Sequence, residues 1–390
     1  MPKVDPELET TVLAYLYDHP GTTKKEISKC TDYSFPTITK GIEALLGKGL
    51  IRKRGVKDTS AGRKPSIYEF DGSNYFFVGI DLSIPKFTIA LFDLSKRLVA
   101  SGGGFLDMEA INEGDHSSIP GTLIKHVKSL INRSSISDKR IKGLGVGVPG
   151  IVRKGAFKPV TRFETEEMVP LRDPLQKELG FPVTVGNDVD QELLSVLDYK
   201  GLKNESDIVA VYLAVRAGER SRARVNIGGS IYHNGHILQG RNGTAGEFGH
   251  TSVNVRLEED LPDCKCGNKN CLDNYVNTKI SRASNPKAFP SEITRALNQK
   301  IKDLLFIFNP SLLVVDMEAF PEIRREVFEN AKAFSRDLAG ELCIEEIEID
   351  SVGDSSMACA RGAIINQLCE KIREPSKYAE MFTTDENDRG

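Results

Sequence analysis

The sequence lacks any apolar run long enough to cross a bilayer. Its longest apolar runs, such as residues 208–215, are strand-sized, whereas a membrane-spanning helix needs about 20 apolar residues. Residues 1–7 also lack the apolar core that a secretory signal requires. We therefore expect a cytoplasmic protein that does not insert into a membrane.

The sequence also lacks any strong compositional bias. Hydrophobic residues make up 39% of the chain and charged residues 27%, which excludes a disordered, collagen-like or low-complexity protein. A chain of 390 residues is too long for one compact domain of roughly 100–200 residues. We therefore expect two or three globular domains.

The cysteines do not form a disulfide framework. Their number, seven, is odd, and three of them crowd into eight residues while the other four are scattered. This distribution favours a metal site in a reducing compartment.

Charge is distributed unevenly along the chain. Residues 22–68 hold eleven Lys or Arg against four Asp or Glu, although the whole chain has a net charge of -3. A small basic module on an acidic body is suited to electrostatic attraction of one end to a polyanion.

The basic module has the helix signals of a winged helix-turn-helix. Leu8, Val12 and Leu16 form one apolar stripe of a first helix that ends near residue 19. Thr23 and Glu26 have capping-box spacing for a short second helix over about 24–30. A third helix begins after a three-residue turn, and its expected core-facing residues are Phe35, Ile38, Ile42 and Leu45, with Ser34 as the N-cap.

Two helices joined by so short a turn match the helix-turn-helix, whose second member enters the major groove of DNA. Residues 50–54 and 65–70 resemble the two strands of a wing with a basic tip. The candidate DNA contacts are Ser34, Thr37 and Lys40 on the third helix, and Arg63 and Lys64 on the wing. The alternative is a small basic helical bundle used for protein contacts.

The body is predicted to be α/β, with two similar lobes. Strands and helices alternate from residue 76 to residue 148, and a similar order recurs after residue 186, which indicates mostly parallel sheets. We place the DNA-binding domain at 1–70, the first lobe at 71–186 with a C-terminal helix 357–373 returning to it, and the second lobe at 187–356. Clefts between α/β domains are usual sites for small ligands.

Asn187 and Asp188 follow a strand-like segment, at a position where open α/β sheets place their ligands. An Asp there can bind or deprotonate a hydroxyl. The alternative, equally favoured by the residue types, is that the pair simply caps the next helix.

A glycine-rich loop, 240–250, contains Glu247 and His250, and its glycines allow close backbone approach to a ligand. Cys264, Cys266 and Cys271 follow it, so one imidazole would complete a tetrahedral Cys₃His zinc site. Four protein ligands leave no position for water, which predicts a structural Zn²⁺. The alternative is three unconnected thiols.

These motifs identify the chain as resembling the ROK family (repressor, open reading frame, kinase). The segments that carry the resemblance are 145–150, 187–188, 243–250 and 264–273. It implies an actin-like, two-lobed sugar-kinase fold, with an N-terminal winged helix in those members that are sugar-responsive transcription factors.

The resemblance also implies residue roles. Asp188 would be the counterpart of the kinase's catalytic base, and Asn187, Glu247 and His250 would contact sugar hydroxyls. His250 with the three cysteines would bind zinc. Asp273 stands where the family has Glu, one methylene longer, so this sugar contact departs from the pattern, as do extra residues between His250 and Cys264.

Both phosphate-binding turns of a kinase are damaged in this sequence. Residues 81–86, Asp-Leu-Ser-Ile-Pro-Lys, lack the glycines that let backbone N–H groups approach phosphate. Residues 217–229 replace the second glycine-rich loop with a segment rich in Arg. Arg216, Arg220, Arg222 and Arg224 could bind an anionic effector, although such a run is more often a solvated loop.

We therefore expect a transcriptional regulator, most often a repressor in this family, and not an enzyme. A homodimer or homotetramer would bind operator DNA, and a sugar or sugar-phosphate effector in the cleft would change the spacing of its winged helices. Two alternatives are an active ATP-dependent sugar kinase with a DNA-binding domain, and a DNA-binding scaffold that ignores sugars.

Overall fold

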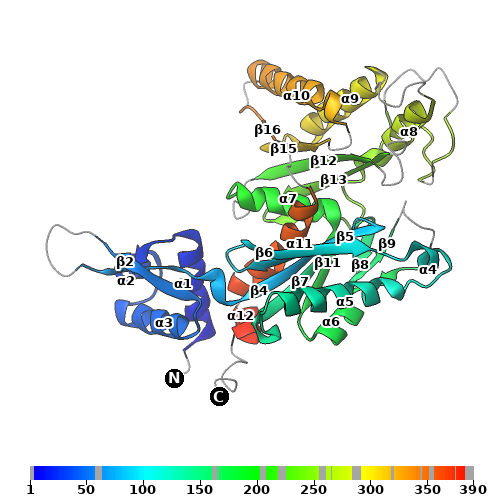
Figure 1. Cartoon of the computed structure of the whole chain (residues 1–390). Coiled ribbons are helices and arrows are strands. Elements are labelled where there is room, and N and C mark those ends of the chain that lie inside the picture. Colours follow the sequence, from blue (N-terminus) through cyan, green and yellow to red (C-terminus); the bar gives the residue numbers. More distant parts are fainter. Residues whose placement is uncertain are drawn as a thin grey trace.

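The protein is described by a computed structural model with a small N-terminal unit, residues 4–70, beside a two-lobed body (Figure 1). The described residues are 4–57, 64–159, 165, 167–202, 208–217, 225–253, 261–264, 266–282, 291–317, 320–342, 345–350, 355–373 and 375–382. Arg63 of the predicted wing, and Arg220, Arg222 and Arg224 of the basic segment, lie outside these residues.

The N-terminal unit has the element order of a winged helix-turn-helix. Its elements are α1 (Pro6–Asp18), β1 (Thr22–Thr23), α2 (Lys24–Cys30), α3 (Phe35–Gly47), β2 (Ile51–Val56) and β3 (Ser66–Phe70). The Thr23–Glu26 capping box starts α2, and the Ser34 side chain caps α3, as predicted. The three strands form a sheet in the order β1-β3-β2.

One core prediction for this unit is wrong. Phe35 is 52% exposed, whereas Ile38, Ile42 and Leu45 are buried. Phe35 is the first residue of α3, so it lies one turn before the part of the helix that α1 covers. It projects at the N-terminus of α3, beside Ser34.

The first lobe is built on a five-stranded sheet in the order β11-β7-β4-β5-β6. The strands are β4 (Phe76–Asp81), β5 (Lys86–Asp93), β6 (Leu98–Phe105), β7 (Ile141–Val148) and β11 (Val183–Asn187). Helices α4 (Met108–Asn112), α5 (Ser118–Arg133) and α6 (Arg172–Leu179) accompany it, with a small sheet of β8 (Ile151–Arg153), β9 (Ala156–Lys158) and β10 (Val169–Pro170). Strands β11, β7 and β4 are parallel, and β5 and β6 continue antiparallel.

The second lobe repeats this plan in a sheet of order β14-β13-β12-β15-β16. Its strands are β12 (Val209–Ala217), β13 (Val225–His233), β14 (His236–Ile237), β15 (Leu312–Asp316) and β16 (Glu348–Asp350). Strands β12, β15 and β16 are parallel, and β13 and β14 are antiparallel. Helices α8 (Leu272–Arg282), α9 (Ser291–Phe308) and α10 (Pro321–Leu342) complete the lobe. The matching strand order supports the predicted repeat, although α10 was not expected from the sequence.

Two helices lie between the sheets. Helix α7 (Asp188–Tyr199) packs against α11 (Ser355–Arg373), which in turn covers β4 and β7 of the first lobe (Figure 1). Helix α12 (Pro375–Phe382) then packs on α1. A continuous hydrophobic cluster therefore joins the N-terminal unit to the first lobe, and it includes Leu13, Phe77, Ile364 and Tyr378.

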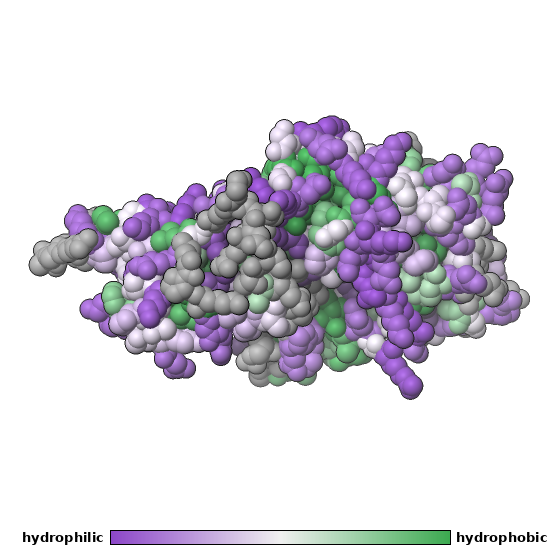
Figure 2. Space-filling view, turned by 90° about the horizontal axis from the view of Figure 1, so that it is seen from below, coloured by the Kyte–Doolittle hydropathy of each residue, from purple (hydrophilic) through white to green (hydrophobic). Residues whose placement is uncertain are grey.

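The exposed surface agrees with this layout. On the face seen in Figure 2, hydrophilic side chains cover much of both the N-terminal unit and the body, with smaller hydrophobic areas between them. Among the described helices, none combines the length and apolar character needed to span a membrane.

Candidate functional site between the lobes

A pocket opens between the two lobes at the N-terminus of α7. The first lobe contributes Pro149, Gly150 and Val152. Asn187, at the end of β11, and Asp188 and Asp190, on α7, add polar groups, and the second lobe contributes Arg216, Glu247, His250 and Asp273. All five residues that the sequence analysis proposed as sugar contacts therefore line one pocket.

Asn187 ends β11 and caps α7. Its side-chain oxygen accepts hydrogen bonds from the backbone N–H groups of Val189 (3.0 Å) and Asp190 (3.3 Å), and its Nδ2 donates to Gly150 O at 3.0 Å. The capping alternative raised by the sequence is thus correct for Asn187. This cap fixes the direction in which the next residue, Asp188, enters the pocket.

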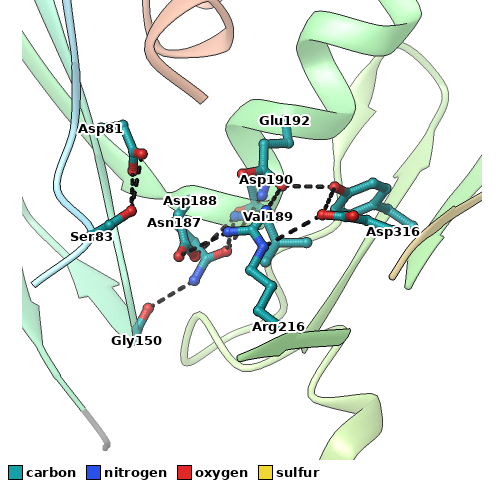
Figure 3. A network of polar contacts seen from close by, with 11 residues as sticks. Asp81, Ser83, Gly150, Asn187, Asp188, Val189, Asp190, Glu192, Arg216 and Asp316 are labelled. Atoms are coloured by element: carbon teal, nitrogen blue, oxygen red, sulfur yellow. Dashed lines mark hydrogen bonds and ion pairs between the residues drawn. The ribbon is translucent and has the colours of Figure 1, made fainter. Parts of the chain in front are cut away.

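Arg216, near the end of β12, is surrounded by carboxylates (Figure 3). Its guanidinium lies 3.7 Å from Asp188 Oδ2 and 3.6 Å from Asp316 Oδ2, and it forms an ion pair with Glu192. The Glu192 and Asp316 side chains are 1% and 5% exposed. Tyr212 donates a hydrogen bond to Glu192 at 2.7 Å. Arg216 is therefore an internal cation and not part of a solvated loop.

Asp81 faces this group from the first lobe. It ends β4 and accepts hydrogen bonds from the Ser83 hydroxyl at 2.9 and 3.0 Å. The pKa of Asp81 is raised to about 7, mainly by burial and also by the negative charge of Asp188, while Arg216 and the Ser83 hydrogen bond act in the opposite direction. The two lobes thus bring acidic groups together across the cleft, with Arg216 between them (Figure 3).

Asp190 lies one residue beyond Val189 on α7 and is partly buried. Its Oδ1 accepts a hydrogen bond of 2.6 Å from the Ser230 hydroxyl on β13. Burial raises the pKa of Asp190 to about 7, and the charges of Asp188 and Glu247 add to the increase. This side of the pocket is therefore rich in acceptor oxygens with few cations nearby.

Glu247 is positioned by glycines that pack on β13. A Cβ at Gly246, whose φ is +89°, would lie 2.3 Å from Gly229 O, and one at Gly249 would lie 2.2 Å from Ile227 O. The sequence predicted that the glycines of this loop let its backbone approach a ligand. At Gly246 and Gly249, the backbone instead lies close to β13. Burial raises the pKa of Glu247, whereas the adjacent His250 lowers it.

Asp273 begins α8 and is tied to β13. Its Oδ1 accepts a hydrogen bond from the Ile227 backbone N–H at 3.2 Å, and Oδ2 lies 3.3 Å from Asn277 Nδ2. Asp273, whose side chain is one methylene shorter than the Glu of the family pattern, therefore holds β13, the strand that forms one wall of the pocket. Its contact with a sugar stays a prediction.

A candidate metal centre adjoins the pocket. One ligand atom from each of His250, Cys264, Cys266 and Cys271 lies within 4.8 Å of all the others, and His250 Nδ1 is 3.8 Å from Cys264 Sγ. Three soft sulfur donors and one imidazole suit tetrahedral zinc. With Zn–S bonds of about 2.3 Å, neighbouring donor atoms around the metal lie only slightly closer together than His250 Nδ1 and Cys264 Sγ do here. Hydrogen bonds from Asn268 Nδ2 to His250 O (3.4 Å) and Ser252 Oγ (3.0 Å) join the Cys segment to the loop that bears His250.

The DNA-contact candidates lie on the N-terminal unit, away from the pocket. Ser34 and Lys40 are exposed, and Thr37 is partly exposed. The hydroxyls of Ser34 and Thr37 are 2.8 Å apart. Lys57 pairs with Glu26, which lowers the pKa of Glu26 to about 2 and ties the wing to α2. Lys64 lies in the described part of the wing.

The first phosphate turn of a kinase has a different role here. Leu82 and Ile84 are buried in the core of the first lobe. The Leu82 backbone N–H donates to Gly147 O at 2.9 Å, and Pro85 has no N–H. The side chains of this turn therefore pack into the first-lobe core, and the Leu82 amide is bound to Gly147 O. A phosphate-binding turn would instead leave its amide groups accessible to the phosphate.

The family profile that matches residues 77–288 is that of the ROK family. The chain belongs to the ROK family. A xylose repressor of Caldicellulosiruptor bescii is 25% identical over 296 residues, which cover 75% of this chain and 67% of that protein. The transcriptional regulator NagC of Escherichia coli is 24% identical over 272 residues, covering 68% and 62% of the two chains.

Solved structures confirm the predicted fold. A ROK family transcriptional regulator described as a homologue of the Escherichia coli Mlc protein has a TM-score of 0.72 at 17% identity, covering 96% of this chain and 99% of its own. A ROK hexokinase from Thermus thermophilus has a TM-score of 0.55 at 22% identity, covering 75% and 98%. The regulator thus covers nearly all of this chain and the kinase three quarters of it.

Several residues of this ROK protein's cleft were missed by the sequence analysis. Glu192, Asp316, Asp190 and Asp81 were not singled out, and Arg216 was grouped with the basic segment that follows it. The available signal was position, because Asp81, Arg216 and Asp316 each stand at or next to the end of an apolar strand.

Proposed function

We propose that this protein is a DNA-binding transcriptional repressor of sugar-metabolism genes, with a sugar effector in the pocket between the lobes. The observation that carries this function is the combination of a winged helix-turn-helix unit with a ROK body in one continuous fold. The curated relatives described above are named as a repressor and a transcriptional regulator. As a repressor, the protein would act as a dimer on a roughly palindromic operator.

The pocket favours an unphosphorylated sugar. An ionised carboxylate accepts hydrogen bonds but has no proton to donate. Four carboxylates line the pocket, those of Asp188, Asp190, Glu247 and Asp273. A ligand with neighbouring hydroxyls supplies the matching donors. Among the described residues of the lining, Arg216 is the only Lys or Arg, and its charge is already shared by three carboxylates. A phosphate group would therefore meet mainly negative charge.

The same arrangement supports a regulator without kinase activity. Phosphoryl transfer depends on positioned donors and Mg²⁺ around the phosphates. Here the Leu82 amide is used by Gly147, and the Arg216 guanidinium lies beside Asp188, the counterpart of the kinase base. The base is thus held in an ion pair, which lowers its tendency to take a proton from a sugar hydroxyl.

Zinc is proposed as a structural cofactor. The four donors would complete its coordination and would hold His250, and with it the Glu247 loop, against the Cys segment. Bound Zn²⁺ also stabilises the thiolate form of its cysteine ligands. Without a metal, burial disfavours loss of the thiol proton from Cys271. The metal would therefore shape the wall of the sugar pocket without contributing chemistry to it.

The DNA surface is proposed to centre on the N-terminus of α3 and on the wing. Lys40, Lys64 and Arg63 would contact phosphates, and Ser34 and Thr37 would lie near base edges. Exposed Phe35 extends this surface with an apolar ring, which suits contact with a thymine methyl group.

A thermal-shift screen with the full chain tests the ligand class. Xylose, glucose and N-acetylglucosamine, their phosphate esters and ATP with Mg²⁺ would be compared, because a ligand of the folded state raises the melting temperature. We expect a free sugar to stabilise the protein more than its phosphate ester, and ATP to have no effect. ATP-dependent phosphorylation of any of these sugars would instead support the kinase alternative.

Selection of duplexes from random DNA tests the operator function. Lys40→Ala and Phe35→Ala should each weaken binding to the selected duplex, and Lys40→Ala should also reduce the salt dependence. Exposed Lys128 on α5, outside the N-terminal unit, provides the control Lys128→Ala. Equal binding by all variants would remove α3 from the interface.

A further inference from the structure

The far end of α7 makes a contact that the pocket does not explain. Asp198, in the last turn of α7, accepts hydrogen bonds of 2.7 and 2.8 Å from Lys96 Nζ. The two side chains are only 14% and 20% exposed. Partial burial makes such a pair stronger and more sensitive to geometry than a surface ion pair.

Lys96 also contacts the N-terminal unit. Its ammonium lies 4.9 Å from the centre of the Tyr17 ring on α1, a cation–π contact. The Tyr17 ring packs edge-on against Phe70 of β3, with the ring centres 5.2 Å apart. One ammonium group thus joins α7 to a helix and a wing strand of the unit that we propose binds DNA.

The position of Lys96 is fixed by a tight turn between β5 and β6. Lys96 has a φ of 62°, in the left-handed region that side-chain-bearing residues rarely adopt. The Lys96 and Arg97 backbone N–H groups donate to Asp93 O and Asp93 Oδ1, both at 2.9 Å. The ammonium is therefore presented from a rigid part of the first lobe.

Helix α7 packs on α11, between the two lobes, and also on the sheet of the second lobe. Leu193, Leu194 and Leu197 share a buried cluster with residues of β12 and β15. At the C-terminus of the helix, Lys200 pairs with Glu348 and Asp350 near β16, each at 2.6 Å. The Lys96–Asp198 contact therefore joins the first lobe to a helix that lies between the two lobes, so a tilt of α7 against the first lobe would alter it.

The crossing of α7 with α11 provides a pivot. A Cβ at Gly362 would lie 1.6 Å from Gln191 O, so the two helix backbones touch near the pocket end of α7. Asp198 is seven residues further on, about 10 Å at 1.5 Å per residue. A rotation of about 10° at the crossing moves Asp198 by about 2 Å, which is enough to break a hydrogen bond.

We infer that Lys96 and Asp198 are positioning residues that transmit closure of the lobes around a ligand to the DNA-binding unit. Ligand at Asp188 tilts α7, the tilt changes the Lys96–Asp198 bond, and Lys96 then shifts against Tyr17. The inference rests on the proposed function, because it assigns the route by which the sugar pocket and the operator surface affect each other.

The test measures operator affinity with and without a sugar in the wild type, Lys96→Met and Asp198→Asn. The probe is whichever of xylose, glucose and N-acetylglucosamine gives the largest thermal shift, and the DNA is the selected duplex. We expect each variant to bind the sugar within about twofold of wild type and to lose most of the sugar-induced fold-change in operator affinity. Lys96→Arg should retain it, and the double variant should be no worse than either single variant.

Lys128→Met, which removes an exposed lysine from α5 in the same lobe, is the matched control and should behave as wild type. An unchanged fold-change in both Lys96→Met and Asp198→Asn would overturn the inference and leave the proposed function intact. Loss of sugar binding in these variants would also overturn it, because both residues would then act on the pocket itself.

Amide hydrogen exchange separates this inference from failure of the proposed sugar effect. If operator affinity of the wild type does not respond to any sugar, exchange in α7 is compared with and without operator DNA. Slower exchange in wild type but not in Lys96→Met supports the link from α1 to α7 while the sugar effect fails. Identical exchange in the two proteins overturns the link as well.

Discussion

The buried and partly buried carboxylates in and beside the pocket form two groups, and the protein holds them in different ways. Asp188, Glu192 and Asp316 share the guanidinium of Arg216. Asp81 and Asp190 instead accept hydrogen bonds from the neutral hydroxyls of Ser83 and Ser230, and burial raises the pKa of each to about 7. A single hydroxyl can satisfy a buried carboxylate oxygen without offsetting the cost of burying its charge, whereas a nearby cation does offset that cost.

Clustered carboxylates repel one another, so the cleft needs a source of positive charge close to them. Arg216 supplies this charge from within the chain. The candidate zinc site, a few residues from Glu247, represents a third arrangement, in which the cation comes from solution.

The largest expected effect is that of removing Arg216. Arg216→Met should reduce the free energy of unfolding by about 3–5 kcal/mol, because three carboxylates lose their shared cation in a buried position. Urea unfolding measures this effect. The control Arg172→Met removes an exposed arginine that pairs with exposed Asp173 and should change stability little. Similar losses of unfolding free energy in the two variants would mean that the Arg216 ion pairs stabilise the protein no more than a surface ion pair does.

The second prediction concerns Zn²⁺ at the candidate metal centre. A strong chelator should lower the melting temperature of the zinc-loaded protein, but by less than Arg216→Met, because the Cys segment is short. Cys266→Ser, at an exposed position, should lose bound zinc and most of its sensitivity to the chelator. Cys30→Ser, at another exposed cysteine, should bind zinc as wild type does. Stoichiometric zinc in Cys266→Ser would remove Cys266 from the ligand set.

The third prediction concerns Asp190, which has no cationic partner among the described residues. Its pKa is about 7 in the folded state and 3.8 ordinarily, so the folded protein binds more protons between these values. Stability should therefore fall as the pH rises from about 4 to about 7 and then level off. Asp190→Asn cannot ionise and should show a smaller fall, together with higher stability than wild type at pH 8.

Unfolding free energies measured at pH 5 and pH 8 test this difference. Exposed Asp173 on α6 provides the control Asp173→Asn, which should keep the wild-type pH dependence. A steeper fall in Asp190→Asn than in wild type would show that the carboxylate of Asp190 is held as an ion.

The smallest expected effect is at Ser83. The Ser83 hydroxyl lowers the pKa of Asp81, so Ser83→Ala should raise this pKa further and destabilise the ionised form. We expect a loss of about 1–2 kcal/mol at pH 8 and a smaller loss at pH 5, where Asp81 is protonated. Ser129→Ala, at an exposed serine of α5, is the control. Equal losses at both pH values would show that Ser83 acts through packing alone.

Much of the fold could be predicted because its signals are local. The Thr23 capping box, the Ser34 cap and the turn between α2 and α3 involve residues at most five apart in the sequence. Strands and helices alternate between residues 76 and 148 as predicted, because this part of the chain combines clear hydrophobic periods with turn residues. Phe35 was misplaced because periodicity alone does not show where a neighbouring helix stops covering α3.

The candidate site was predicted in part. The motifs brought Asn187, Asp188, Glu247 and His250 to one pocket, and the Cys spacing brought four metal-ligand atoms together. The charges that balance the pocket were not predicted. Arg216 resembled its neighbours in a basic segment, and only the pairing of β12 with β15 shows that it meets Asp316.

The sequence by itself determined the helices of the N-terminal unit and their caps, the donors of the candidate metal site and the loss of glycine from the first phosphate turn, because these depend on neighbouring residues. Tertiary structure decided which charges meet. Asp188 and Arg216 are 28 residues apart, and Lys96 and Asp198 are 102 residues apart. Electrostatic energy depends on distance and burial in the folded protein, and neither quantity is encoded in local sequence spacing.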